Sequence, residues 1–136
     1  RSDQQKLMDW QLGQYRKYIR VMNATARLYG VKAMFFLQPV PALGKTLTEE
    51  EARATPDTSY GERYAQIVRD LEGLRGEGIA VQSLLDVFAT EKRTIYADSI
   101  HAYRDAQAQH ESPGYRLMAA RMAREMAEGW GLQIKD

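Results

Sequence analysis

Residues 31–39 read VKAMFFLQP, a short apolar run that follows a glycine and ends at Pro39. A run of this length between two such residues is typical of a strand whose two faces are both buried. We therefore predict a strand over Val31 to Leu37. A second apolar run, IAVQSLLDVFA at residues 79–89, predicts another strand over about Ile79 to Leu85.

A helical pattern precedes the first of these runs. Apolar residues recur at three- and four-residue steps from Asp3 to Tyr29, which predicts a long helix. Ser2 or Asp3 is suited to cap its start, because a short side-chain oxygen accepts a free N–H there. Gly30 stands where helices commonly end in a left-handed residue.

Strands alternate with helices along the rest of the chain. Apolar stripes predict further helices over Tyr60 to Leu74 and over Pro113 to Trp130. This order predicts an α/β protein with a parallel sheet covered on both faces. Two parallel strands make a poor independent unit, so we expect one edge or face of the sheet to be covered by polypeptide outside this sequence.

A long polar segment separates the first strand from the second stripe. It reads VPALGKTLTEEEARATPDTS, and we expect a loop with one helical turn at LTEEEARA. Thr48 and Glu51 have the spacing of a capping box at the start of that turn. Loops of this length are often lids or binding loops, and many are decoration only.

Composition fits one soluble domain formed by all 136 residues. The net charge of +1, with basic and acidic residues interleaved, does not suggest a nucleic-acid partner. No apolar run approaches the ~20 residues that span a bilayer. The chain has no cysteine, which excludes disulfides and thiolate chemistry. The absence does not determine the compartment, and a secreted or periplasmic location stays open. It begins at RSDQQ without a methionine, so we expect that something preceded it.

The chemistry-bearing residues follow the second strand, in IYADSIH at residues 95–101. Asp98 and His101 are three residues apart beyond the carboxyl end of a strand, where sites form in open α/β sheets. A carboxylate beside a histidine fixes the imidazole tautomer, and the other ring nitrogen can then take a proton from a hydroxyl. This is the acid and base part of a nucleophilic triad. An Asp-x-x-His pair by itself also occurs by chance in surface loops.

The surrounding sequence resembles the last conserved block of SGNH (GDSL-type) hydrolases. In that family an Asp-x-x-His pair follows the last strand, and a glycine and an alanine-rich helix come next, as in IYADSIH and ESPGYRLMAARMA here. The segments GVKAMFFLQPVPALGKTLTEEE and YAQIVRDLEGLRGEGIAVQSLLDVFA extend the resemblance to residues 15–132. It implies part of a three-layer α/β/α fold with a parallel sheet, the flavodoxin-like fold of these hydrolases, with the N-terminal half absent. Residues 1–136 would be the C-terminal portion of that single domain.

Carried over to this chain, the resemblance makes His101 the general base and Asp98 the acid that orients it. The insertion AYRDAQAQHESP before Gly114 is longer than the family spacing and adds His110 as a rival base. The position three residues before His110 is Gln107 and not an aspartate, which favours His101.

The family's nucleophilic serine, in a Gly-Asp-Ser block, and its oxyanion-hole Gly and Asn are not recognisable in this chain. The chain has five serines, and all stand in other contexts: Ser2, Ser59, Ser83, Ser99 and Ser112. The resemblance therefore implies a serine esterase-type hydrolase that is complete only with the missing N-terminal half or another copy of the chain. Its substrate would be a small ester or an acylated carbohydrate or lipid, and this chain alone would be inactive.

The sequence leaves a second class of function open, a non-catalytic interaction or scaffold domain derived from an SGNH hydrolase. It gives no sign of a cofactor, and its two histidines lack metal-ligand spacing. Gln38 is either at the rim of the site or only a strand-end residue, and Tyr96 is interpreted as a packing residue. The methionines at positions 118, 122 and 126 are interpreted as core packing.

Overall fold

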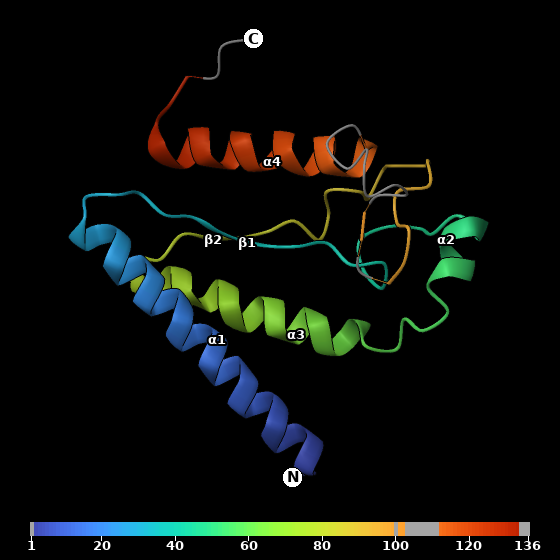
Figure 1. The fold of residues 1–136 in the computed structure, drawn as a ribbon, viewed down its shortest axis with the longest axis horizontal. Coiled ribbons are helices and arrows are strands. Elements are labelled where there is room, and N and C mark those ends of the chain that lie inside the picture. The colour runs from blue at the N-terminus through green and yellow to red at the C-terminus, as the bar shows by residue number, and fades with distance from the viewer. Residues whose placement is uncertain (1, 100, 103–111, 134–136) are drawn as a thin grey trace.

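The computed structural model of the chain describes residues 2–99, 101–102 and 112–133. Figure 1 shows a long first helix, a central pair of strands and a last helix that ends near the C-terminus. In chain order the elements are α1 (Asp3–Leu28), β1 (Phe35–Leu37), α2 (Glu49–Ala54), α3 (Gly61–Glu72), the 3₁₀ helix η1 (Gly73–Glu77), β2 (Val81–Ser83) and α4 (Pro113–Trp130).

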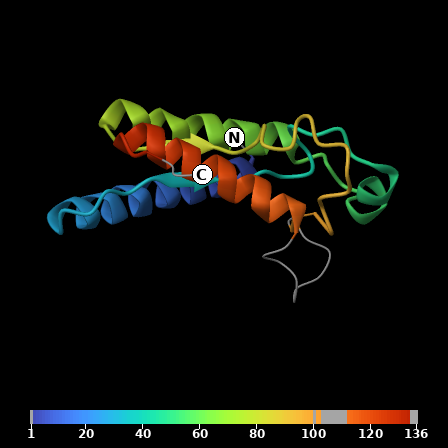
Figure 2. The same ribbon diagram turned by 90° about the horizontal axis from the view of Figure 1, so that it is seen from above.

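The two strands pair in parallel, as the sequence predicts. Phe35 lies opposite Val81, and Leu37 lies opposite Ser83. Figures 1 and 2 show α4 on one side of the strands and α1 and α3 on the other side. The chain is therefore a mixed α/β protein with a small parallel sheet. Two strands are fewer than the three-layer SGNH fold requires, so that finer assignment stays a prediction.

Both strands are shorter than predicted, because the residues at their ends bond elsewhere. The N–H of Val31 donates to the Ala26 carbonyl at 2.8 Å, so Val31 belongs to the end of α1 and not to β1. The N–H of Ile79 donates to the Leu74 carbonyl at 3.3 Å, which ties it to the end of η1. Past β2, the chain enters a turn instead of continuing to Leu85.

The outer edge of β1 is left open by this pairing. Phe35 donates its N–H to the Ala80 carbonyl at 2.8 Å, and the Leu37 carbonyl accepts from the Leu84 N–H at 2.9 Å. Alternate residues of a strand bond to the same neighbour, so the N–H and C=O of Phe36 point to the opposite edge. The sheet of the described residues has no strand on that edge.

The apolar interior of the described residues includes two clusters. The first joins α1 and α3 to the strands, and its buried members are Ile19, Leu71, Leu74, Ile79 and Val81. The second lies under the beginning of α4, where Leu117 and Met118 pack against it, and its buried members are Phe88, Ile95, Tyr96 and Ala102. The second cluster lies directly beside Asp98 and His101 in the chain. Among the described residues, no helix combines the length and apolar character needed to cross a membrane.

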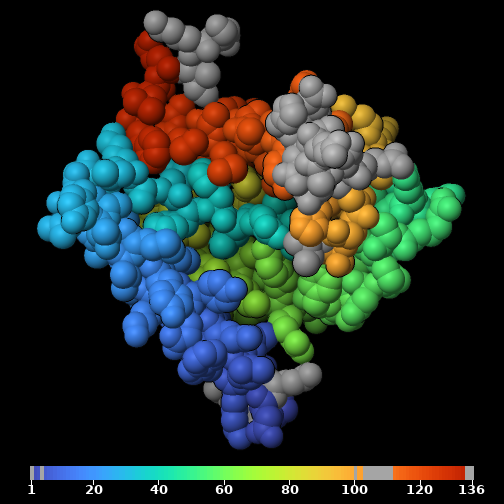
Figure 3. All heavy atoms as spheres, in the orientation of Figure 1, coloured from blue at the N-terminus to red at the C-terminus, as the bar shows by residue number. Residues whose placement is uncertain are grey.

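Much of the apolar stripe of α1 faces outward. Ile19 is buried, with 7% of its surface exposed, whereas Trp10 is 62% and Tyr18 58% exposed. Figure 3 shows the first part of α1 projecting from the rest of the protein. The large apolar residues exposed on and just after α1 are Leu7, Trp10, Tyr15, Tyr18, Val21, Met22, Leu28, Tyr29 and Val31.

The helix ends follow from local sequence. Ser2 caps α1 by accepting the N–H of Gln5 at 3.3 Å, and Gly30 follows the helix with a φ of 69°. The predicted second stripe is helical only as far as Glu72, after which η1 tightens the chain and Gly78 ends it with a φ of 74°. The predicted bounds of α4 match the structure.

Candidate functional site

Asp98 and His101 contact each other as their spacing predicts. One carboxylate oxygen of Asp98, Oδ2, lies 2.7 Å from Nδ1 of His101. The other oxygen, Oδ1, accepts the backbone N–H of His101 at 2.7 Å, and the His101 carbonyl accepts the N–H of Ala97 at 2.8 Å. The aspartate thus holds both the ring and the backbone of the histidine, which fixes the orientation of the imidazole.

This contact determines which ring nitrogen is basic. We assign the proton of the neutral ring to Nδ1, because the group that faces it is a carboxylate, an acceptor only. Nε2 then carries the lone pair that can take a proton from a hydroxyl. Both side chains are about half exposed, at 51% for Asp98 and 47% for His101. A substrate can therefore approach the ring from outside.

A pocket of about 140 Å³ lies beside His101, at the carboxyl end of β1. Gln38, which follows β1, lines this pocket, so the structure places it at the rim of the site. Open α/β sheets bind ligands at this end of their strands. The pocket is lined by Gln38, Pro39, His101, Ala102, Tyr115 and Met118.

The first turn of α4 holds the loop on the C-terminal side of His101. The hydroxyl of Ser112, the N-cap residue of α4, donates to the Ala102 carbonyl at 3.1 Å. Gly114 packs against the same carbonyl, and a Cβ at this position would lie 2.5 Å from that oxygen and 2.8 Å from Cγ2 of Ile95. The glycine is therefore needed for the close approach of helix and loop.

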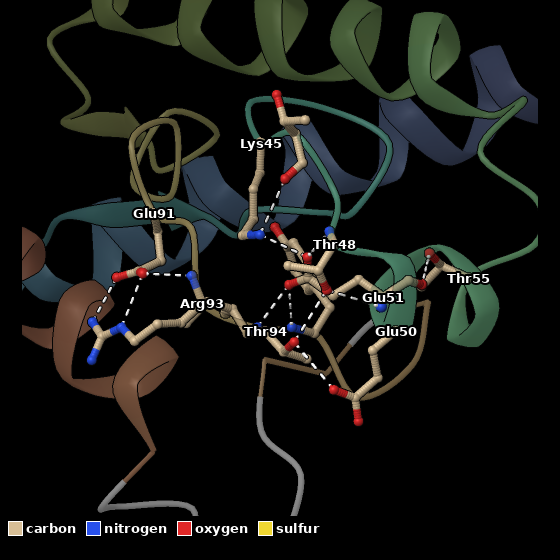
Figure 4. Close-up of polar contacts among 11 residues, drawn as sticks. Lys45, Thr48, Glu50, Glu51, Thr55, Glu91, Arg93 and Thr94 are labelled. Atoms are coloured by element: carbon tan, nitrogen blue, oxygen red, sulfur yellow. Dashed lines mark hydrogen bonds and ion pairs between the residues drawn. The ribbon is translucent and has the colours of Figure 1, made fainter.

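The long segment between β1 and α3 holds the same loop on its N-terminal side. Oε1 of Glu51 accepts the backbone N–H of Ile95 at 2.7 Å and that of Tyr96 at 3.0 Å. Oε2 accepts from Nζ of Lys45 at 2.6 Å and from the N–H of Thr48 at 2.7 Å. Figure 4 shows the Glu51 side chain among these groups. The segment between β1 and α3 thus supports the loop that carries Asp98 and His101.

The Glu51 carboxylate is charged in spite of its burial. Its side chain and that of Lys45 are both completely buried. Burial alone would raise the pKa of Glu51, but the hydrogen bonds from Lys45, Thr48, Ile95 and Tyr96 outweigh it and hold this pKa below its usual range. The two side chains therefore form a buried ion pair.

Tyrosines add contacts around the site. The Tyr60 hydroxyl donates to the Ser99 carbonyl at 3.4 Å, and the Tyr64 hydroxyl donates to the Gln38 carbonyl at 3.0 Å. Tyr96 packs edge-on against Phe88, with ring centroids 5.6 Å apart, and is 1% exposed. It is a packing residue, as the sequence suggests.

Comparison with protein-family models, with curated proteins and with solved structures finds no significant match to this chain. The resemblance to SGNH hydrolases therefore depends on the motif residues quoted above. The geometry of Asp98 and His101 stands independently of it.

The remaining candidates of the sequence are placed only in part. His110 and Gln107 lie outside the described residues. Ser2 and Ser112 cap helices, and the hydroxyl of Ser83 accepts the N–H of Leu85 at 3.2 Å. Within the described part of the chain, no three His, Asp or Glu side chains are grouped as metal ligands would be.

The sequence predicts one half of the Glu51 arrangement, the capping box. The predicted capping box is present, because Thr48 accepts the N–H of Glu51 at 3.2 Å and Glu51 accepts the N–H of Thr48. The contact with Lys45 and the contacts with residues 95 and 96 were missed. A lysine six residues before a capping glutamate is a signal too common to predict a buried pair, and backbone donors have no sequence signal.

Proposed function

We propose that this chain carries the acid and the base of a serine esterase-type hydrolase of the SGNH type. Asp98 is the orienting acid and His101 is the general base. The observation that carries the proposal is the double contact of the Asp98 carboxylate with Nδ1 and the backbone N–H of His101. The pocket beside His101, which Gln38 and Pro39 line just after the carboxyl end of β1, supports it.

The proposed chemistry is acyl transfer through a serine that another polypeptide segment supplies. Nε2 of His101 takes the proton of the serine hydroxyl while the serine oxygen bonds to the ester carbonyl carbon. The ester C–O bond then breaks, and the alcohol leaves with the proton from the imidazolium. A water molecule then attacks the carbonyl carbon of the acyl-enzyme while His101 takes a proton from the water. The bond to the serine oxygen breaks, the serine regains a proton from the imidazolium, and the carboxylic acid is released. Asp98 stabilises the imidazolium in both halves of the reaction.

The open edge of β1 and the exposed face of α1 support the need for a further segment. Hydrogen-bonding groups on a strand edge pair readily with another strand. A groove of about 520 Å³ runs along this side of the sheet, between α1 and α3, and is lined by Tyr15, Ile19, Phe35, Phe36, Leu37, Gln38, Tyr64, Ile67, Val68 and Leu71. We propose that the nucleophile-bearing segment places a strand against β1. Its source is the N-terminal half of the same domain or a second copy.

Hydrolysis of a nitrophenyl acetate tests this function. We compare the isolated chain, the protein encoded by the whole reading frame, and the variants His101→Ala and His110→Ala of that protein. The expected result is no activity from the isolated chain, activity from the whole protein, and loss of most of it in His101→Ala but not in His110→Ala. Activity of the isolated chain that a serine-directed inhibitor stops would mean that one of its own five serines is the nucleophile.

A second candidate function is supported by the same exposed surface. An interaction or scaffold domain would use the aromatic residues of α1, such as Trp10 and Tyr18, to bind a partner and would need no triad. Whole protein that hydrolyses no ester, or that ignores the loss of His101, favours this alternative.

A further inference from the structure

The described residues of the loop that carries Asp98 and His101, 84–99 and 101–102, lie in no helix or strand. Residues 84–99 form turns and bends between β2 and the site. A carboxylate and an imidazole on such a loop keep a fixed geometry only if other contacts hold the backbone. The contacts on the N-terminal side come from the segment between β1 and α3, and Glu51 makes two of them.

The position of Glu51 is itself fixed from several sides. Its backbone lies in the first turn of α2, and the Thr48 capping box fixes the direction of its side chain. Thr48 also contacts the Thr94 hydroxyl at 3.1 Å, and Thr94 donates to Glu50 at 3.2 Å. The segment between β1 and α3 therefore contacts three successive residues of the loop, 94 to 96.

The cation of the pair is held by a second close approach. Gly44 precedes Lys45 and has a φ of 75°, a conformation that other residues rarely adopt. A Cβ on Gly44 would overlap the carbonyl of Leu85, just after β2. The backbone just before Lys45 is thus packed against the chain that follows β2.

We propose that Glu51 is a positioning residue for His101, with Lys45 as its counter-ion. By accepting the N–H groups of Ile95 and Tyr96, it fixes the loop backbone just before Asp98, and so the position from which Asp98 orients the imidazole. The catalytic meaning of this role rests on the proposed function, whereas the positioning itself does not.

A purely structural ion pair is the rival explanation, and substitution by apolar residues separates the two. Replacing both members of a buried pair by apolar residues of similar volume often leaves a protein as stable as before. It cannot replace the acceptor of two buried backbone N–H groups, which would remain unpaired. The double variant should therefore be more stable than Glu51→Met, which leaves the buried charge of Lys45 unpaired, but should not recover the position of His101.

The test measures the tautomer of His101 by nitrogen NMR of the imidazole rings, above the pH range in which an ordinary histidine titrates. The chain has two histidines, so His110 serves as an internal reference. The variants are Glu51→Met, Lys45→Met and the double variant, each checked for folding by circular dichroism. Glu49→Gln is the matched control, because Glu49 lies in the same helical turn with its side chain 97% exposed.

We expect His101 to keep its Nδ1–H tautomer in the wild type, in Lys45→Met and in Glu49→Gln. In Glu51→Met and in the double variant it shifts toward the Nε2–H form, and exchange of the amides of residues 95 and 96 accelerates about 10- to 100-fold. An unchanged His101 signal in either folded variant overturns the proposal, as does an equal shift in Lys45→Met.

Two further measurements separate the possible failures. If Glu51→Met and the double variant do not fold, hydrogen exchange of the wild type still tests the contact, because amides 95 and 96 should exchange slowly. Exchange at the rate of exposed amides would refute it. The tautomer of His101 could change in Glu51→Met while ester hydrolysis by the whole protein is unchanged in His101→Ala. That pair of results would support the positioning role and refute only the catalytic function.

Discussion

Glu51 accepts the backbone N–H of Tyr96 at 3.0 Å, although 45 residues separate them in the sequence. The contact joins a six-residue helix in a long connecting segment to the loop that carries Asp98. The length and composition of this connecting segment alone are equally compatible with a lid or with a loop that has no role at the site. Its capping glutamate makes it a support for the candidate site.

Acid should weaken this support. Burial raises the pKa of Glu51, but hydrogen bonds from Lys45 and three backbone N–H groups outweigh it, so the pKa lies below its usual value of 4.5. A carboxyl whose pKa is lowered on folding stabilises the folded state above that usual value, and the stabilisation is lost as the pH falls through the folded-state pKa. We expect the free energy of unfolding to fall more steeply with acid in the wild type than in the Lys45→Met, Glu51→Met double variant.

Urea unfolding at a series of pH values below neutrality measures this difference. Other carboxyls of lowered pKa, such as Glu91 at about 2, are common to both proteins and cancel in the comparison. Parallel pH profiles for the two proteins would show that Glu51 does not titrate differently in the folded and unfolded states.

The same substitution at two glycines should have opposite effects on stability. Gly114→Ala places a Cβ 2.5 Å from the Ala102 carbonyl oxygen, a backbone atom, and should cost about 1–3 kcal/mol of unfolding free energy. Gly13 lies within α1 and has nothing within 4 Å of its Cβ position. Gly13→Ala should therefore add about 0.5–1 kcal/mol, because alanine is the better helix former. Urea unfolding of both variants tests the pair, and equal effects would contradict the packing at Gly114.

Local sequence was sufficient to predict the helices and the Asp98–His101 contact. Ser112 and Pro113 mark the start of α4 by capping chemistry, and three-residue spacing lets the Asp98 carboxylate reach both the ring and the backbone N–H of His101. These interactions lie within a few residues of the chain. A sequence pattern can therefore carry them.

The features that sequence did not predict depend on distant partners. The length of β1 is set by its hydrogen bonds to β2. The N–H of Val31 bonds to the Ala26 carbonyl at the end of α1 and so is not part of the strand. The stripe on α1 predicts a helix but not that Trp10 is 62% exposed. Glu51 could be identified as a cap but not as a buried partner of Lys45, because its other partners are backbone N–H groups, which every residue except proline has.

Asp98→Asn should separate orientation of the histidine from its presence. An amide can donate as well as accept, so it can stabilise the wrong imidazole tautomer and cannot stabilise the imidazolium. In the whole protein we expect ester hydrolysis to fall by about 10⁴-fold. Asp57→Asn is the control, because Asp57 also accepts a backbone N–H two residues on, from Ser59 at 2.9 Å. A small loss in Asp98→Asn, similar to that in the control, would exclude a triad.

The open edge of β1 gives the last prediction. The N–H of Phe36 points away from β2, whereas the N–H of Phe35 bonds to Ala80. Proline lacks this N–H and is tolerated on a strand edge that pairs with no other strand of the described residues. Phe36→Pro should therefore leave the isolated chain folded and weaken its association with another strand, whereas Phe35→Pro should unfold the sheet.

Light scattering of the purified chain over a range of concentrations measures that association, with Phe36→Ala as the control for loss of the ring. With an open edge and an exposed apolar face on α1, the wild-type chain should form larger species as its concentration rises, and Phe36→Pro should do so less than Phe36→Ala. A wild-type chain that stays monomeric would exclude a second copy as the source of the neighbouring strand. The proposal would then require the strand to come from the N-terminal half of the domain. Equal association of the proline and alanine variants would show instead that α1, and not the edge of β1, holds the copies together.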